Sequence, residues 1–560
     1  MAEITESKNF IHAFIEEDIA EGGRYAGQTV HTRFPPEPNG YLHIGHCKAL
    51  IIDFGTAEKF GGLCNLRMDD TNPTKEDVEF VEAIQEDIRW LGFDWADRFY
   101  YGSDYFEKDY EYAVELIKKG LAYVCELTPE EMRDPKYCGD VNHPAVSPWR
   151  DRPIEESLDL FERMKNGEFP DGKYTLRAKI DLASGNFWLR DPAIYRIRHV
   201  EHHRQGNKWC LYPLYDFAHP IQDALEGVTH SLCDINYEIH RPLYNWVIEN
   251  VFEEGELAYK GFPRQIEFAR LNLTYTVLSK RFLRGLVEDG VVDGWDDPRM
   301  PTLCGLRRRG YSGEAILRFV EGAGVAKSEN LVDIRQLEAC IRDELNEIAP
   351  RRIAIKDPIK VVITNFEGRD EFELPNHPQK PEMGTRKVPF TKELYIDASD
   401  FAEVPPSKFF RMKPGGEVRL MGAYLVTCNE IIKNEDGSIK ELHCTADLET
   451  RNGNPADGHK VKGTIHWLSA ENAIPTTLHL YEQLTTLENP SELPEGKTYT
   501  DFINPNSLKV VEGALLEGSL AEAACGEKFQ FVRDGYYVKD IRHENTYNLV
   551  VGLKDSFPKK

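Results

Sequence analysis

The chain has 560 residues, of which 41% are hydrophobic and 29% charged, and its formal net charge is −26. This length exceeds what one hydrophobic core supports, so several domains are expected. The negative charge excludes a protein that coats nucleic acid nonspecifically, because that mode needs summed basic charge.

The sequence contains no apolar run long enough to cross a bilayer, and Met1–Glu6 lacks the charged-then-apolar layout of a signal peptide. The eleven cysteines are odd in number, lie between Cys47 and Cys525, and form no Cys-x-x-Cys pair. They indicate reduced thiols, and a cytoplasmic location is expected.

The first predicted elements are a strand over 30–34, a turn rich in proline, and a helix that continues from Cys47. His43 and His46 then share one face of the first helical turn, beside N–H groups that favour an anion. Gly45 leaves the backbone bare for a flat purine. This segment predicts a nucleoside triphosphate site; the alternative is two surface histidines at an ordinary helix start.

A second strand over 64–68 ends in Asp69-Asp70, and a helix follows from Asn72 to Gly92. The apolar stripe of that helix is predicted to be Val78, Val81, Ile84, Ile88 and Leu91. Alternating strands and helices imply a parallel sheet whose ligands lie at the carboxyl ends of its strands. Arg33, His43 and Asp69 fall at that edge.

The pattern is interrupted between roughly Ser103 and Lys208, which indicates an insertion in the sheet. The sheet is predicted to resume at 209–212, to run through 215–219 and to continue to 266–271. A helical segment over 280–348 follows, and short β-type runs separated by turn signals predict an all-β last third.

Ser279 and Lys280, just after the resumed sheet, offer a hydroxyl and a compact ammonium to a phosphate. With the earlier motif, the sequence resembles class I aminoacyl-tRNA synthetases, whose signatures are His-Ile-Gly-His and Lys-Met-Ser-Lys-Ser. Within that class it resembles the glutaminyl-tRNA synthetase family over the whole chain. The segments that carry this likeness are Pro36–His46, Asp69–Pro73, Gly227–Cys233 and Val277–Arg281. Val277 and Leu278 replace the Lys and Met of the second signature, whereas Lys280 is kept.

The resemblance implies an α/β Rossmann-type catalytic domain with an inserted α+β acceptor-binding domain, a helical connecting domain and C-terminal all-β anticodon-binding barrels. The implied ranges are 27–102 and 209–279 for the catalytic halves, 103–208 for the insertion, 280–348 for the helical domain, 349–400 with 475–553 for the proximal barrel, and 401–474 for the distal barrel.

The implied activity is ATP-dependent ligation of L-glutamine to tRNA(Gln) through a glutaminyl-adenylate, with release of AMP and pyrophosphate. His43, His46 and Lys280 are the implied catalytic residues. The implied ATP-binding residues are Glu37, Pro38, Asn39, His43, Ile44, Gly45, His46, Cys47, Lys48, Ala49, Asp234, Arg270, Leu271, Leu278, Ser279 and Lys280. Mg²⁺ is expected on the triphosphate, and no metal ligands or bound zinc are expected from the protein.

Asp69 is the implied partner of the amino acid's α-ammonium, and the other implied glutamine-binding residues are Arg33, Tyr215, Cys233 and Gln265. Glutamine and glutamate have nearly the same shape, so their discrimination depends on buried charge. Glutamyl relatives usually carry an arginine at the position of Cys233, and an uncharged thiol removes that partner for a carboxylate.

Lys327, Arg351, Lys408 and Arg411 lie in segments that resemble tRNA contacts. Ile239 stands where the family carries an acidic residue that reads the acceptor stem. Arginine clusters at 307–309 and 351–352 fit either local RNA contacts or a solvated surface.

Three other functions compete with this interpretation: a glutamyl-tRNA synthetase, a small-molecule nucleotidylyltransferase and an inactive synthetase-like RNA-binding protein. Cys233 argues against the first, the β-rich last third against the second, and the intact His43, His46, Asp69 and Lys280 against the third. Cys125, Cys138 and His143 lack a chelating pair, so a zinc site is disfavoured. The family implies a monomer.

Overall fold

The computed structural model of the protein describes residues 9–73, 78–128, 130–131, 134, 146–253, 256–257 and 261–554. They fall into two compact units. The first holds the described residues up to Asn272 together with Leu317–Val332, and the second holds Leu273–Ile316 and the described residues from Asp333 onward. In these segments, no helix combines the length and the apolar character needed to span a bilayer.

A parallel sheet forms the centre of the first unit, as the sequence predicted. Strand β1 (His31–Phe34) pairs with β2 (Leu63–Met68), and β2 pairs with β3 (Phe99–Tyr101). Strands β8 (His230–Asp234) and β9 (Arg264–Phe268) form a second parallel pair. The three strands β1–β3 and the pair β8–β9 are neighbours, because the N–H of Thr229 donates to the carbonyl of His31 at 2.9 Å.

The two faces of this sheet differ in chemistry. On one face, Val30, Leu232, Ile266 and Phe268 form an apolar cluster with helix α1 (Phe10–Ile19). Because side chains alternate along a strand, Arg33, Cys233 and Gln265 share the opposite face. Strand β2 is buried on both faces, including Asn65 and Arg67, so the polar half of its alternation lies inside the protein.

The helices of the first unit include those predicted after His43 and after Asn72. They are α2 (Ile44–Leu50), a π-helical turn over Ile51–Gly55, α3 (Thr56–Lys59), α4 (Val78–Trp90), α5 (Phe106–Lys118), α7 (Ile154–Lys165), α8 (Tyr215–Leu225) and α9 (Arg241–Val251). In α4 the predicted stripe is buried at Val81, Ile84 and Ile88, but Val78 is 57% exposed. Val78 is the first residue of α4.

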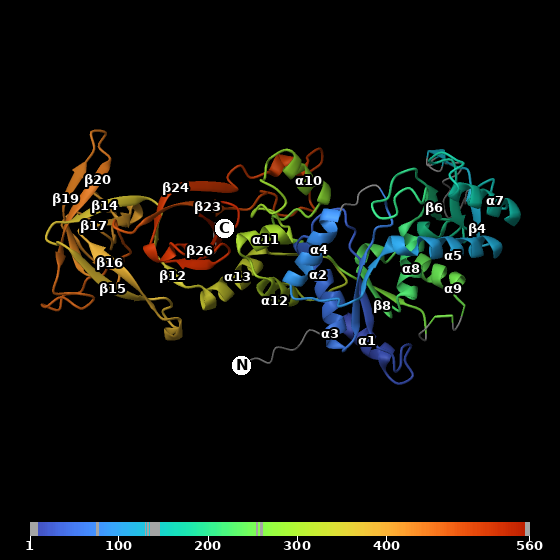
Figure 1. Ribbon diagram of the computed structural model, residues 1–560, viewed down its shortest axis with the longest axis horizontal. Helices are drawn as coiled ribbons and strands as arrows, with labels where there is room; N and C mark the ends of the chain where they lie inside the picture. Colours follow the sequence, from blue (N-terminus) through green and yellow to red (C-terminus); the bar gives the residue numbers. More distant parts are fainter. Residues whose placement is uncertain are drawn as a thin grey trace. The chain divides into compact units, whose positions relative to one another are not determined.

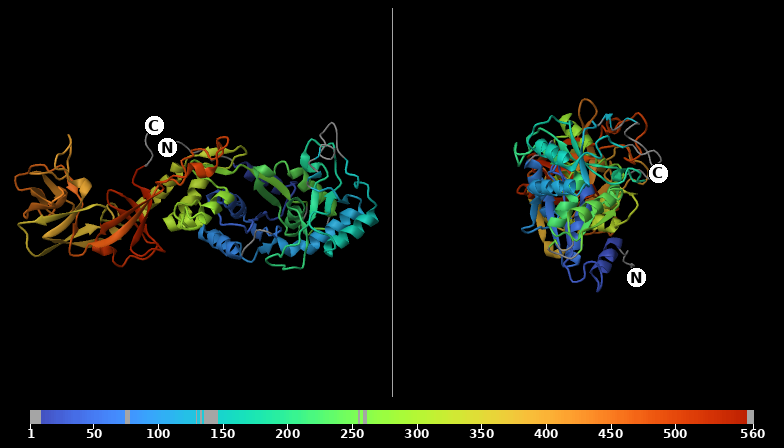
Figure 2. Two further views of the ribbon diagram at one scale, coloured as in Figure 1. Left: turned by 90° about the horizontal axis from the view of Figure 1, so that it is seen from above. Right: turned by 90° about the vertical axis from the view of Figure 1, so that its right-hand side faces the viewer.

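The inserted segment forms an antiparallel sheet of its own in the order β4 (Ala122–Cys125), β5 (Thr175–Ala178), β6 (Ala193–Ile197) and β7 (Leu211–Pro213). Helices α5 and α7 lie together against it, and one apolar cluster joins them (Figures 1 and 2). The run at 209–212, predicted as the return of the catalytic sheet, instead supplies β7, which pairs with β6.

The prediction of sheet structure at 215–219 was wrong, because Tyr215 begins helix α8. The run Phe217, Ala218, Ile221 and Ala224 is buried at helical spacing. A short apolar run fits a buried strand and a buried helix equally well, and the tertiary contacts decide between them. The catalytic sheet resumes only at β8.

The predicted helical segment is confirmed by α10 (Lys280–Glu288), α11 (Leu303–Arg309), α12 (Gly313–Ala323) and α13 (Ile334–Ile348). Two short strands accompany it, β10 (Leu271–Leu273) and β11 (Asn330–Val332). Helix α10 begins where the side chain of Ser279 accepts a hydrogen bond from the N–H of Phe282, which makes Ser279 its N-cap.

The last third of the chain is β structure, as predicted. One seven-stranded sheet has the order β12 (Arg351–Arg352), β25 (Lys528–Phe531), β26 (Gly535–Lys539), β27 (Thr546–Gly552), β23 (Ile474–Tyr481), β24 (Leu508–Leu516) and β13 (Ala354–Ile355). The other has the order β21 (Thr464–Ile465), β18 (Glu417–Leu420), β19 (Leu425–Lys433), β20 (Ile439–Asp447), β14 (Pro358–Ile363), β17 (Glu393–Asp397) and β22 (Leu468–Ser469). A separate hairpin joins β15 (Arg369–Pro375) to β16 (Thr385–Thr391).

The pairing of these strands divides the chain differently from the predicted barrel ranges. Strands β14 and β17 lie in the range 349–400, yet they pair with β20 and β22 of the range 401–474 (Figure 1). Turn signals locate strands along a chain, but they do not identify the strand with which each one pairs.

Candidate active site

The two motif histidines lie where β1 passes into α2. His43 is the extended N-cap residue of α2, and its backbone N–H donates to Nδ1 of His46 at 3.0 Å. The two rings lie 3.8 Å apart, centre to centre. Since Nδ1 of His46 accepts this bond, the proton of the neutral ring is on Nε2, where it can be donated to a ligand.

Asp69 follows β2 and lies beside the turn that precedes α2. Its backbone N–H donates to the carbonyl of Pro36 at 2.9 Å, and its carboxylate accepts from the hydroxyl of Thr71 at 2.9 Å. Burial, and then the neighbouring Glu37 carboxylate, raise the pKa of Asp69 to about 6. The carboxylate therefore titrates close to neutral pH.

Arg33 lies beneath the site, with a side chain that is only 1% exposed. Its Nε donates to Asp223 at 3.1 Å, and its terminal nitrogens donate to Ser231 Oγ at 2.7 Å, to Cys233 Sγ at 3.3 Å and to the carbonyl of Leu232 at 2.8 Å. These bonds join Arg33 to Cys233 and to other groups of the protein, and its contact with glutamine stays a prediction.

The charges around Arg33 balance. Asp223 also pairs with Arg67 at 2.7 Å, and Arg67 pairs with Glu226 at 3.1 Å, so two buried cations face two buried anions. Burial lowers the pKa of His219, which also contacts Arg33, to about 3, and its ring is neutral at pH 7. Burial by itself raises the pKa of Asp223. Arg33, His219 and Arg67 outweigh that effect and hold this pKa below its ordinary value.

Two tyrosines line the same region. Tyr215, the first residue of α8, stacks on His219 with ring centres 4.8 Å apart, and it lies 5.2 Å from the ring of Tyr237. Burial raises the pKa of Tyr215 well above its ordinary value, and Cys233 and Asp69 are among the groups that act on it electrostatically. Cys233 and Asp69 are therefore electrostatic neighbours of Tyr215.

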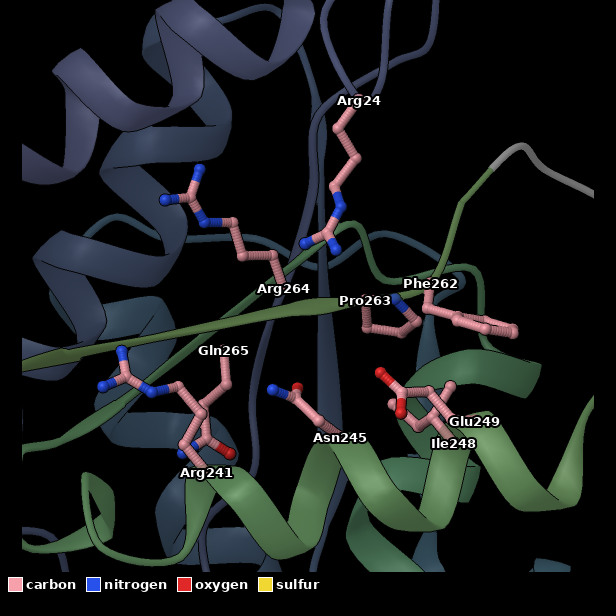
Figure 3. A pocket seen from close by; sticks show the side chains of 9 residues that line it. All are labelled: Arg24, Arg241, Asn245, Ile248, Glu249, Phe262, Pro263, Arg264 and Gln265. Carbon is pink, nitrogen blue, oxygen red and sulfur yellow. The ribbon is translucent and has the colours of Figure 1, made fainter.

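Gln265 lies on the same sheet face as Cys233, but its amide is already engaged. Its Nε2 donates to the carbonyl of Tyr237 at 3.1 Å and to the carboxylate of Glu267 at 2.9 Å. It also lines a polar cavity of about 200 Å³, together with α9 residues such as Arg241 and Asn245 (Figure 3). These bonds connect the amide nitrogen of Gln265 to Tyr237 and Glu267, and its contact with glutamine stays a prediction.

Some predicted nucleotide-binding residues also lie together in the first unit. Arg270, just after β9, forms an ion pair with Asp234 at the carboxyl end of β8. Lys48 on α2 is 4% exposed; burial lowers its pKa, and Asp234 opposes this shift. Leu271 is buried. Ser279 and Lys280, by contrast, belong to the second unit.

Family models match nearly the whole chain. Residues 29–347 match the catalytic domain of tRNA synthetases class I (E and Q), and residues 349–447 and 464–540 match anti-codon binding domains of the same group. The chain belongs to the class I glutamyl and glutaminyl tRNA synthetase family. As a class I synthetase it uses ATP as a substrate, and its C-terminal sheets are anticodon-binding domains.

Curated relatives of this synthetase match it along their full length. Glutamine–tRNA ligase of Clostridium kluyveri is 51% identical, over 100% of this chain and 99% of the relative. The enzymes of the same name from Xanthomonas axonopodis pv. citri and Vibrio cholerae are 52% identical, over 99% and 98% of this chain and 98% of each relative. A crystal structure of a glutamate tRNA ligase from Elizabethkingia meningosepticum, in complex with its amino acid, matches 57% of this chain and 70% of its own at 20% identity and a TM-score of 0.40.

The residues predicted to contact tRNA occupy different environments in this synthetase. Lys327 is exposed, with its ammonium 5.0 and 5.1 Å from the ring centres of Phe10 and Phe14. Lys408 is exposed at a positive φ of 65°, and Arg411 pairs with Asp400 at 3.3 Å. Ile239 is 57% exposed. Their contacts with tRNA stay predictions.

The two arginine clusters are built largely into the synthetase's own packing. Arg351 is buried, and it donates to the carbonyls of Asn346 and Ala349 at 3.0 and 2.7 Å. Arg308 forms a buried two-bond ion pair with Asp540 at 2.9 and 3.0 Å. Arg308 and Arg351 therefore contribute to the packing of the protein, and a contact of Arg351 with tRNA stays a prediction.

A corner made by Asp70, His202 and His203 has the composition of a metal site, with ligand atoms within 4.8 Å of one another. Both ring nitrogens of His202 are engaged, however, because Nε2 bonds the carbonyl of Asp70 at 2.7 Å and Nδ1 accepts from the N–H groups of Arg204 and Gln205. The corner therefore joins the insertion to the sheet. Of the zinc candidates, Cys138 and His143 lie outside the described residues, and Cys125 is buried.

Several site residues went unnoticed in the sequence: Tyr237, His219, Asp223 and Arg67. A signal existed for Arg67, His219 and Asp223. Arg33 and Arg67 are charged residues inside strands of a parallel sheet, which is buried on both faces and so requires anionic partners. His219 and Asp223 are spaced four residues apart, which places them on one face of a helix.

Proposed function

We propose that the protein ligates L-glutamine to tRNA(Gln), forming a glutaminyl-adenylate from ATP and releasing pyrophosphate and then AMP. The observation that carries this proposal is the match, at 51–52% identity over the whole chain, to enzymes named glutamine–tRNA ligase. The neutral charge balance beside Cys233 is independent support.

In the first step, the carboxylate of glutamine attacks the α-phosphorus of ATP and pyrophosphate leaves. The nucleophile is already present in the substrate, so the protein contributes position and charge. Asp69 pairs with the α-ammonium. Nε2–H of His46 and the ring of His43 donate to phosphate oxygens, and Lys280 neutralises the departing pyrophosphate. Mg²⁺ accompanies the triphosphate as part of the substrate.

The charge balance around Arg33 accounts for a preference for glutamine. Asp223 and Glu226 already neutralise Arg33 and Arg67, and the thiol of Cys233 is uncharged because burial raises its pKa. A glutamate carboxylate entering beside Cys233 would therefore be a buried charge without a counter-ion. The carboxamide of glutamine carries no such cost.

The pKa of Asp69 predicts how glutamine use depends on pH. Only the ionised carboxylate attracts the α-ammonium, so kcat/KM for glutamine is expected to fall as pH drops through about 6. Below that value the loss is about tenfold per pH unit. Asp69→Asn should lower kcat/KM by about 10–100-fold at pH 7.5 and flatten this limb of the profile. Aminoacylation rates between pH 5 and 8 measure both; an unchanged acidic limb in the variant would contradict the assignment.

Charging of purified tRNA pools tests the proposal as a whole. The protein is offered glutamine and glutamate in turn, and the charged tRNA is identified by sequencing. Charging of tRNA(Gln) with glutamine is expected. Preferential charging with glutamate would establish the glutamyl alternative, and failure of ATP–pyrophosphate exchange in the presence of tRNA would establish an inactive synthetase-like protein.

We also propose that the insertion over 103–208 holds the acceptor stem and that the two C-terminal sheets read the anticodon. Splayed single bases are recognised individually on such surfaces. The same proposal includes a cytoplasmic location and a monomeric state. Light scattering of the purified protein, with and without tRNA, measures the mass and so checks the monomeric state.

A further inference from the structure

Two cysteines face one another inside a C-terminal sheet. Strands β19 and β20 run antiparallel, and Cys428 is the register partner of Cys444. Both side chains are fully buried in one apolar cluster with Val426, Leu442 and Trp467. Among the described cysteines, no other two occupy partner positions in a strand pairing.

The backbone around this pair shows which kind of antiparallel position it occupies. The N–H of Cys428 donates to the carbonyl of Gly416, and its carbonyl accepts from the N–H of Gly415 at 2.7 Å. The carbonyl of Cys444 accepts from the N–H of Thr364 at 2.8 Å on its other side. Both cysteines direct backbone bonds away from each other, so they form a non-hydrogen-bonded pair.

That position matches the geometry of a disulfide. Directly opposed residues in a non-hydrogen-bonded pair have Cα atoms about 4.5 Å apart, with side chains closer together than at hydrogen-bonded positions. Disulfides span Cα separations of about 4.4–6.8 Å. Both thiols lie in the same apolar cluster, and the neighbouring Cys444 thiol is the largest cause that lowers the pKa of Cys428.

We propose that Cys428 and Cys444 form a reversible cross-strand disulfide when the protein meets hydrogen peroxide. The Cys428 thiolate attacks one peroxide oxygen, so that an S–O bond forms, the O–O bond breaks and the leaving hydroxide becomes water with the thiol proton. The sulfur of Cys444 then attacks the Cys428 sulfur, the S–O bond breaks, and a second water carries away the other proton. Two thiols lose two electrons, and one peroxide is reduced to two waters.

Access to the pair depends on opening of the ladder beside it. The register of β19 and β20 shifts between Cys428 and Glu430, which leaves Asn429 as an unpaired residue next to Cys428. A bulge of this kind locally disrupts the ladder. Oxidation should therefore be slower than at the exposed Cys525, and mild denaturant should accelerate it.

The test treats the full-length protein with hydrogen peroxide, in buffer and in urea below the unfolding transition, and then alkylates the remaining thiols. Mass spectrometry of the digest should show one linked species, joining the peptides of Cys428 and Cys444 and lighter than their sum by two hydrogens. Dithiothreitol should remove it. The melting temperature of the oxidised protein should rise by several degrees and return on reduction, since the bond closes a loop of the unfolded chain.

Cys525→Ser is the matched control, because it removes an exposed thiol and should leave the linked peptide and the thermal shift intact. Cys428→Ala should remove both. The wild-type digest decides the matter even if that variant folds poorly. Absence of the linked peptide in both buffers would overturn the proposal, as would oxidation of Cys428 to a sulfinic acid with Cys444 left as a thiol.

Discussion

Replacing Asp223 by alanine is expected to lower the free energy of unfolding of the first unit by about 3–5 kcal/mol. Asp223 is fully buried and pairs with both Arg33 and Arg67. Its removal leaves one cation without a counter-ion, where water does not reach it. Urea denaturation followed by the fluorescence of tryptophans such as Trp209 and Trp246 measures the loss.

Asp97→Ala is the control for this change, since the Asp97 side chain is 96% exposed and pairs only at 3.8 Å with Arg98. It should alter stability by less than about 0.5 kcal/mol. If Asp223→Ala costs no more than the control, the charges of Arg33 and Arg67 are neutralised by another group. The Asp223 contribution should persist at pH 5 and decline only below its ordinary pKa, because the folded-state pKa is depressed.

Replacing His46 by alanine is expected to lower kcat for aminoacylation by about 10²–10³-fold. The variant loses the Nε2–H that we assign as a hydrogen-bond donor to the phosphate. This donor acts while negative charge moves from the α-phosphate to the departing pyrophosphate. It also loses the acceptor for the His43 N–H. Single-turnover aminoacylation at saturating ATP and glutamine measures the chemical step.

His46→Asn separates these two losses, because its amide oxygen can replace Nδ1 at the helix start while the Nε2–H is gone. Its melting temperature should match that of the wild type, and its kcat should fall nearly as far as that of His46→Ala. His12→Ala on α1 is the matched control and should keep full activity. Wild-type kcat in His46→Asn would show that His46 acts only by capping α2.

The nucleotide end of the site could be predicted because its signals are local. A strand, a turn with prolines and a helix start are contiguous in the sequence, so the positions of His43 and His46 follow from a dozen residues. The family models confirm the class of enzyme that this motif indicated. The period-two alternation of β2 likewise predicted a strand that ends at Asp69.

The glutamine end depended on contacts between residues far apart in the chain. Arg33 was predicted to lie in the pocket, but whether its charge is available there depends on Asp223, 190 residues away. Gln265 was assigned to the pocket by resemblance, and its bond to the carbonyl of Tyr237, 28 residues earlier, became visible only in the folded chain.

The sequence by itself determined the class I motif, the order of strands and helices and the β-rich last third, because each rests on periodicity and turn chemistry within short windows. Only the tertiary structure decided that 215–219 is helix, that β7 joins the inserted sheet, and that Arg33 is neutralised. The physical reason is that burial, strand partners and counter-ions are properties of segments that meet only when the chain is folded.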